Sequence, residues 1–284
     1  MNLDIEVRKE TDCREMDINE LLEMAKHWNG YKRESAVVAL GLLGDPVALP
    51  ALIERVNDWV PKIRNVSRNS ILEIATKNNV FEFVENLPSF YKLKLCTRDQ
   101  HEKFIEAIES YVTSSENSNV VVNGLRSSNP LVVRACVDLC INYNLLDKLS
   151  LSKIGLSHSD LIVRCRASGL MREFQGEAQQ ELLNVAILDG FMPIRREALQ
   201  IFIALGAKDE FVAPYLFDKH YSIREIAIKR LADSGISVSE AYNCALDSKS
   251  AFTIRCGVWG VGALGEASSL STIERLLTNP YSSV

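Results

Sequence analysis

The sequence lacks any apolar run that approaches the roughly 20 residues needed to span a bilayer, and its N-terminus opens with charged residues rather than an apolar signal core. We therefore expect no membrane contact and a cytoplasmic location. It also lacks a phosphate-cradling glycine loop and a GxSxG nucleophile elbow. Because these absences nominate no catalytic residue, we predict a protein without a cofactor.

The 284-residue chain has no excess of positive charge, with 32 Lys and Arg against 37 Asp and Glu for a net charge of -5. The whole negative surplus lies in residues 1–24, and the rest of the chain sums to zero. A body without net positive charge lacks the electrostatic footprint of a non-specific nucleic-acid binder, so nucleic acid is not the expected partner. We interpret residues 1–16 as an acidic N-terminal segment.

The seven cysteines are an odd number and have none of the paired spacings of zinc ribbons or redox motifs. Cys136 and Cys140 are four residues apart and share a helix face, but two thiols without further ligands make a poor metal site. We expect reduced thiols that serve as small apolar side chains, and no metal site.

One phrase recurs along the chain: an apolar residue, an arginine, and a small or apolar residue three positions later. It reads "PIRREA" at Arg195 and "YSIREIA" at Arg224, with a weaker copy, "YKRESA", at Arg33. The successive separations are 31, 70, 30, 31, 29 and 31 residues between Arg33, Arg64, Arg134, Arg164, Arg195, Arg224 and Arg255. The period is therefore about 30 residues. The interval of 70 holds two units, one of them degenerate.

Each copy has the pattern of a helix hairpin. After the arginine, apolar or small residues recur at three, seven and about ten positions, which is the spacing of an amphipathic helix. Several runs end in glycine, as at Gly44 and Gly206, where a left-handed C-cap is favourable. Asp45 and Pro46 then supply the N-cap and first position of another helix. Such hairpins cannot bury their apolar faces alone, so copies are expected to stack.

The chain resembles the HEAT-repeat family, in particular the short bacterial type of phycobilisome lyases. The resemblance is carried by "ALGLLGDP", "IFIALGAKD" and the D-x5-R pairs Asp58 to Arg64, Asp189 to Arg195 and Asp218 to Arg224. Over residues 17–78 and 116–284 it implies an all-α, right-handed α-solenoid of about eight HEAT-like helix hairpins, and we expect a single solenoid over residues 17–284. The family also implies a structural ladder, in which each recurring arginine binds turn carbonyls and the aspartate of the preceding turn.

The period fails between about residues 79 and 118, where an aromatic, proline-interrupted stretch precedes a predicted helix over 99–111. Arg98 lies about midway between Arg64 and Arg134, so we expect it to mark the register of the degenerate copy. Two interpretations stay open: an irregular repeat with solvated lysines, or a specialised partner contact. The densest basic cluster that includes an aromatic lies here, with Tyr91, Lys92, Lys94, Arg98, His101 and Lys103.

A candidate binding surface follows from the helix geometry. Positions one, five and eight after each ladder arginine should point away from the core, and in HEAT arrays this helix lines the concave side. They hold few charges among many small or amide residues, which suits a protein partner better than duplex DNA. Trp59 is the best exposed aromatic, whereas Trp28 is expected to be buried against the following turn. The candidate partner-binding residues are Trp59, Asn65, Asn69, Tyr91, Lys92, Lys94, Arg98, Asn142, Arg172, Arg196, Gln200 and Lys229.

We interpret the chain as a non-catalytic, bacterial protein-binding scaffold or adaptor, and an immunity protein that occludes a toxin is one form of this role. Metal-dependent HEAT-type hydroxylases resemble the architecture, but they depend on several His-Glu pairs, and only His101-Glu102 occurs here. The alternative is an enzyme subunit, such as a bilin-lyase-like partner or a HEAT-like DNA glycosylase. The final "TNPYSSV" resembles "SNPLVVR" at 128–134, so we expect the array either to end there on a capping helix or to continue.

Overall fold

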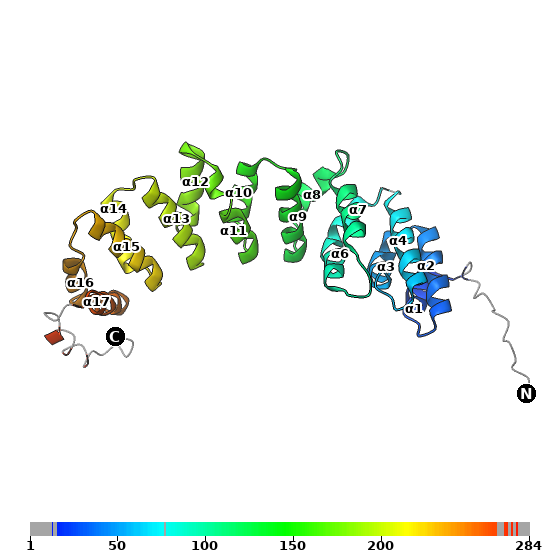
Figure 1. Ribbon diagram of the computed structural model, residues 1–284, viewed down its shortest axis with the longest axis horizontal. Helices are drawn as coiled ribbons and strands as arrows, with labels where there is room; N and C mark the ends of the chain where they lie inside the picture. Colours follow the sequence, from blue (N-terminus) through cyan, green and yellow to red (C-terminus); the bar gives the residue numbers. More distant parts are fainter. Residues whose placement is uncertain are drawn as a thin grey trace, which may run out of the picture. The chain divides into compact units, whose positions relative to one another are not determined.

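The computed structural model describes residues 13, 16–76, 78–265 and the isolated positions 270, 271, 274 and 277. These residues form seventeen α-helices and four short 3-10 helices and, within those ranges, no strand (Figure 1). They fall into two compact units, unit 1 of residues 1–151 and unit 2 of residues 152–284. Short turns join most helices into hairpins, so the predicted all-α, α-solenoid class is confirmed.

Unit 1 begins with two regular hairpins whose ends carry the expected signals. Asp17 caps the first helix through a capping box with Glu20. Gly44 ends the second helix in the left-handed region at φ 65°, and Asp45 accepts a hydrogen bond from the amide of Val47 to start the next hairpin. The helices are α1 (Ile18–Met24) and α2 (Gly30–Leu43), then η1 (Pro46–Ala48), α3 (Leu49–Arg55) and α4 (Pro61–Ala75).

Close packing of α2 on α4 holds these two hairpins together. Gly41 lies so near Ser70 that a side chain at this glycine would overlap the serine. The Ser70 hydroxyl donates to the carbonyl of Val37 at 3.1 Å. Leu40 and Ile71 are fully buried nearby, and each stabilises the fold by about 1.5–3 kcal/mol. The small residues of the repeat phrase therefore let adjacent second helices approach closely.

The irregular segment forms its own aromatic core in unit 1. The ring of Phe83 stacks on Phe90 at 5.8 Å between centroids and meets Tyr111 edge-on at 5.1 Å. Pro88 lies at the start of the second of two short helices, so the chain forms two short helices here instead of one long helix. The predicted helix over 99–111 is confirmed by α7. The elements are α5 (Val80–Glu85), α6 (Leu87–Lys92), η2 (Leu93–Leu95) and α7 (Glu102–Val112), followed by the hairpin of α8 (Ser118–Gly124) and α9 (Pro130–Tyr143).

Unit 2 continues the hairpins from α10, which crosses the boundary between the units. Its last hairpins share a core in which the Tyr242 ring is fully buried and its hydroxyl donates to the carbonyl of Leu216 at 3.2 Å. The helices are α10 (Lys148–Leu156), α11 (Leu161–Ser168), η3 (Met171–Glu173), α12 (Gly176–Ala186), α13 (Met192–Ala204), α14 (Asp209–Val212), η4 (Ala213–Phe217), α15 (Tyr221–Asp233), α16 (Ser239–Leu246) and α17 (Ala251–Leu264).

Some expectations concern residues outside the described part of the chain. The acidic segment 1–16, apart from Cys13 and Met16, and the C-terminal 278–284 are outside the described residues. The single solenoid over 17–284 stays a prediction, since each unit is described by itself. Among the described helices, none has the length and apolar character needed to cross a membrane.

Candidate protein-binding surface

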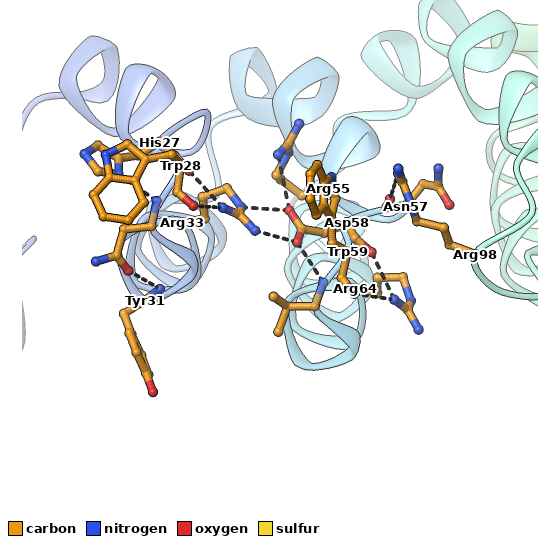
Figure 2. Close-up of polar contacts among 12 residues, drawn as sticks. His27, Trp28, Tyr31, Arg33, Arg55, Asn57, Asp58, Trp59, Arg64 and Arg98 are labelled. Atoms are coloured by element: carbon orange, nitrogen blue, oxygen red, sulfur yellow. Dashed lines mark hydrogen bonds and ion pairs between the residues drawn. The ribbon is translucent and has the colours of Figure 1, made fainter.

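The recurring arginine is a fixed part of the turn that precedes its helix. In the first hairpin, Arg33 Nη1 donates to the carbonyls of His27 and Trp28, both at 2.9 Å (Figure 2). Its Nε and Nη2 donate to the two carboxylate oxygens of Asp58, each at 2.8 Å. The planar guanidinium thus binds two carbonyls of its own turn and, with a fork of two bonds, a carboxylate of the next turn.

The direction of this pairing corrects the sequence prediction. Asp58 belongs to the turn before Arg64, but its carboxylate binds Arg33. The contact of Arg64 with Asp58 is a hydrogen bond to the Asp58 backbone carbonyl, at 2.9 Å. The pair Asp58 to Arg64 therefore contributes to two rungs, because its aspartate binds backwards along the stack while its arginine binds the next aspartate, Asp99. In unit 2 the same pattern joins Arg164 to Asp189 at 2.7 Å.

The next rung of unit 2 repeats the geometry of the first. Arg195 Nη1 donates to the carbonyls of Asp189 and Gly190 at 2.8 and 3.0 Å. Its Nε and Nη2 donate to the Asp218 carboxylate at 3.0 and 2.8 Å. The predicted structural role is thus borne out for Arg33 in unit 1 and for Arg164 and Arg195 in unit 2, and it explains why a charged side chain precedes an apolar helical run.

The Asp58 carboxylate shows what keeps a charge stable in this position. Burial by itself would raise the pKa of Asp58, but the hydrogen bonds from Arg33 and from the Val60 amide, with the charges of Arg33 and Arg55, lower that pKa below its usual value. The carboxylate therefore stays ionised although its side chain is fully buried. Arg33 is also buried, so little solvent screens the pair.

The irregular segment keeps the aspartate of the rung but not the arginine. Asp99 accepts from Arg64 Nε at 3.2 Å and from Arg68 at 3.0 Å. Six residues after Asp99, the arginine position holds Ile105, a buried residue of α7. The prediction that Arg98 marks the register is therefore wrong: its guanidinium is exposed and donates instead to the carbonyl of Asn57 at 3.0 Å.

The ladder changes again at the end of unit 2. Arg224 is buried and binds the Asp218 carbonyl at 2.8 Å, but six residues before the next arginine position stands Lys249 instead of aspartate. Arg224 lies over the ring of Trp259 at 4.1 Å, and its buried Nε has no hydrogen-bond partner among the described residues. Arg255, the next arginine, is exposed over the ring of Phe252, so it does not form the expected buried rung.

Two large aromatic side chains project from consecutive turns of unit 1. Trp28 is 85% exposed and Trp59 is 78% exposed, and each lies five residues before its ladder arginine. The expectation that Trp28 is buried is wrong: its backbone carbonyl accepts a hydrogen bond from the buried Arg33, and its ring is exposed to solvent. Arg98 lies over the Trp59 ring at 5.7 Å. Figure 2 shows Trp28, Trp59 and Arg98 in this order, and we call these residues with Tyr31, which is 67% exposed, the turn edge.

The other candidate residues are distributed over several helices. Tyr91 is half-buried, and Lys94 lies 3.9 Å from Glu109 and over the Tyr91 ring at 4.7 Å, so these two side chains also serve internal packing. Arg172 pairs with Glu197 at 2.5 Å on an exposed surface. Besides Tyr91 and Lys94, the structure brings Trp59 and Arg98 together. The remaining candidates are exposed: Asn65, Asn69, Lys92, Asn142, Arg172, Arg196, Gln200 and Lys229.

Groups that could support chemistry are few in the described part of the chain. It contains no cluster of three or more His, Cys, Asp or Glu side chains placed to hold a metal ion. Burial raises the pKa of the Cys136 thiol to about 12 and that of Cys140 to about 11, so both remain protonated at neutral pH. These two cysteines are buried apolar groups, as expected.

A comparison with protein-family models matches part of the chain. Residues 32–58 match the family model of the PBS lyase HEAT-like repeat, which confirms the resemblance over the segment from Arg33 to Asp58. No curated protein matches the chain at a significant level. Among solved structures, the X-ray structure of YibA from Escherichia coli is similar, with 15% identity and a TM-score of 0.32, over 93% of this chain and 88% of that chain.

Proposed function

We propose that this chain is a non-catalytic protein-binding scaffold, and that a protein partner contacts the turn edge of unit 1. The supporting observation is the pair of exposed rings, Trp28 and Trp59, on turns whose carbonyls are held by Arg33 and Arg64. Tryptophan is enriched among the side chains that dominate protein interfaces, and large exposed apolar groups mark interaction surfaces.

The rungs supply a reason for binding without rearrangement. A turn that is hydrogen-bonded to a buried guanidinium has few conformations to lose when a partner arrives. The scaffold therefore presents its aromatic side chains from a rigid backbone. A free loop with the same rings would lose more conformational entropy on association.

The exposed second-helix faces are the second part of the proposal. Asn65 and Asn69 in unit 1, and Arg196, Gln200 and Lys229 in unit 2, point to solvent and offer hydrogen-bond donors and acceptors. Polar groups of this kind surround the apolar centre of protein interfaces.

Affinity purification with mass spectrometry from the source cells tests the proposal. Two variants are compared with the wild type: Trp28→Ala with Trp59→Ala, and Asn69→Ala with Arg172→Glu and Lys229→Glu. We expect a specific co-purifying protein that the tryptophan variant loses, with unchanged helicity by circular dichroism. Retention of every protein by both variants would refute these surfaces as the binding site. Titration with a bilin and a salt-dependent gel shift with duplex DNA address the enzyme-subunit alternative, and binding of either ligand would favour it.

A further inference from the structure

The exposed guanidinium of Arg98 has capacity to bind a ligand. Of its five N–H donors, Nη1 donates to the Asn57 carbonyl at 3.0 Å, which fixes the side chain beside the Trp59 ring (Figure 2). This single backbone bond holds the group in place while the other nitrogens remain at the exposed end. A guanidinium presented in this way can take a carboxylate through two parallel bonds.

The charge around Arg98 is also in surplus. Arg64 and Arg68 both donate to the same oxygen of Asp99, so two guanidinium groups bind one carboxylate, while the hydrogen bond of Arg98 goes to the Asn57 carbonyl. The hydrogen bond from the Gln100 amide and the contacts with these arginines lower the pKa of Asp99, although burial opposes them. The carboxylate is therefore ionised and contributes one negative charge beside the two arginines. A shallow hollow here is lined by Trp59, Pro61, Arg64 and Arg98. Its charge is complementary to a carboxylate.

Trp28 provides a second apolar contact one repeat away. Trp28 and Trp59 occupy equivalent positions in adjacent repeats, and packed helices lie about 8–10 Å apart. A peptide in the polyproline II conformation advances about 3.1 Å per residue with three residues per turn, so side chains three residues apart lie on one side and match this spacing. The ring surfaces and the free guanidinium together form a row of two apolar contacts followed by one cationic contact.

We propose that the turn edge binds an acidic peptide segment of the partner protein, with Arg98 binding an Asp or Glu carboxylate and both tryptophans packing on neighbouring apolar side chains. This rests on the proposed function and names the chemistry of its partner. A nucleic-acid strand fits less well, because it needs cations repeated along a face, and the nearby Lys62 is already paired with Glu34 at 2.6 Å.

Selection from a phage-displayed library of random dodecapeptides tests this proposal on the full chain. The wild type should enrich peptides in which an Asp or Glu follows or precedes apolar residues. The most enriched peptide, made synthetically, should bind about 10- to 100-fold more weakly to Arg98→Glu, the loss expected for one bidentate contact, and similarly to Trp59→Ala. Arg126→Glu, a change at another exposed arginine of unit 1, is the matched control and should bind as the wild type does.

Several results would overturn the proposal. These are the absence of enrichment, enrichment of basic or uncharged peptides, or equal binding of the acidic peptide and its Asn and Gln analogue. Tighter binding of an oligo(dT) strand that depends on Arg98 would assign the site to nucleic acid instead. If peptides bind Arg98→Glu and Trp59→Ala as tightly as they bind the wild type, the scaffold function stands and only this site is wrong. If no protein co-purifies specifically with the wild type, that result would instead count against the scaffold function itself.

Discussion

The Arg33–Asp58 rung makes a strong prediction about stability. Arg33→Leu removes both bonds to a fully buried carboxylate and the donor of two turn carbonyls. Removing one partner of a buried pair costs about 3–5 kcal/mol, because the remaining charge is left uncompensated. In the variant, Asp58 keeps its hydrogen bonds from Arg55 at 3.2 Å and from the Val60 amide at 3.0 Å, which compensate part of its charge. We therefore expect the free energy of unfolding to fall by about 3 kcal/mol, the lower end of that range.

The chain contains its own control for this experiment. Arg255 occupies the same place in its repeat but is exposed, so Arg255→Leu should change the free energy of unfolding by less than about 0.5 kcal/mol. Urea unfolding followed by circular dichroism gives both values. Hydrogen exchange of α2 and α4 localises the loss, since repeat proteins need not unfold in one step. A cost below about 1 kcal/mol for Arg33→Leu would refute the reasoning.

A second substitution separates lost bonds from stranded charge. Asp58→Asn added to Arg33→Leu removes the unpaired carboxylate, so part of the lost stability should return. The folded pKa of Asp58 is depressed, so the rung stabilises the protein above the unfolded value of about 3.9 and this contribution disappears as the pH falls through the folded pKa. The double variant should therefore lose less stability in acid than the wild type, and an identical acid transition would contradict this assignment.

Three further predictions concern other parts of the fold. Burial, aided by a neighbouring arginine, lowers the pKa of His101, so stability should fall as the pH drops below about 6.5, where only the unfolded histidine gains a proton. His101→Gln should remove this slope between pH 5.5 and 7 in urea melts, and an unchanged slope excludes His101 as its source. Lys249→Asp should supply the missing carboxylate to Arg224 and raise the free energy of unfolding by about 1 kcal/mol, whereas a lower melting temperature would show that the Trp259 contact is preferred. Gly260→Ala should overlap the Tyr242 ring and cost about 1–3 kcal/mol by urea titration, so a neutral result would mean that the ring can shift.

The periodic part of the fold was predictable because its signals are local. The recurrence near every 30 residues, the capping residues Asp45 and Gly44, and the apolar spacing after each arginine depend only on neighbours along the chain. Binding of Arg33 to its own turn is equally local, since His27 and Trp28 lie six and five residues before it.

Pairings between repeats were not predictable in the same way. Asp58 precedes Arg64 in the sequence motif, yet the nearest guanidinium in space is that of Arg33, 25 residues earlier. In the irregular segment the equivalent aspartate, Asp99, is 35 residues after Arg64, and no fixed spacing identifies it. The aspartates that recur in the turns, such as Asp58, Asp189 and Asp218, were the only sequence signal available.

The candidate site was predicted only in part. Trp59 and Arg98 were both selected from the sequence, but as members of separate surfaces, and Trp28 was expected to be buried against the following turn. A tryptophan at a helix end gives no indication of its direction, because that depends on which atoms of its residue the surrounding fold uses. Here the buried guanidinium binds the Trp28 carbonyl, and the ring is left on the outside.

The sequence alone determined the repeat, its helices and the recurring arginine at the start of most second helices, because hydrogen bonding and apolar periodicity act over a few residues. The tertiary structure decided which carboxylate each arginine binds and which aromatic rings reach solvent. Those outcomes depend on distances between repeats, which exist only after the hairpins have packed.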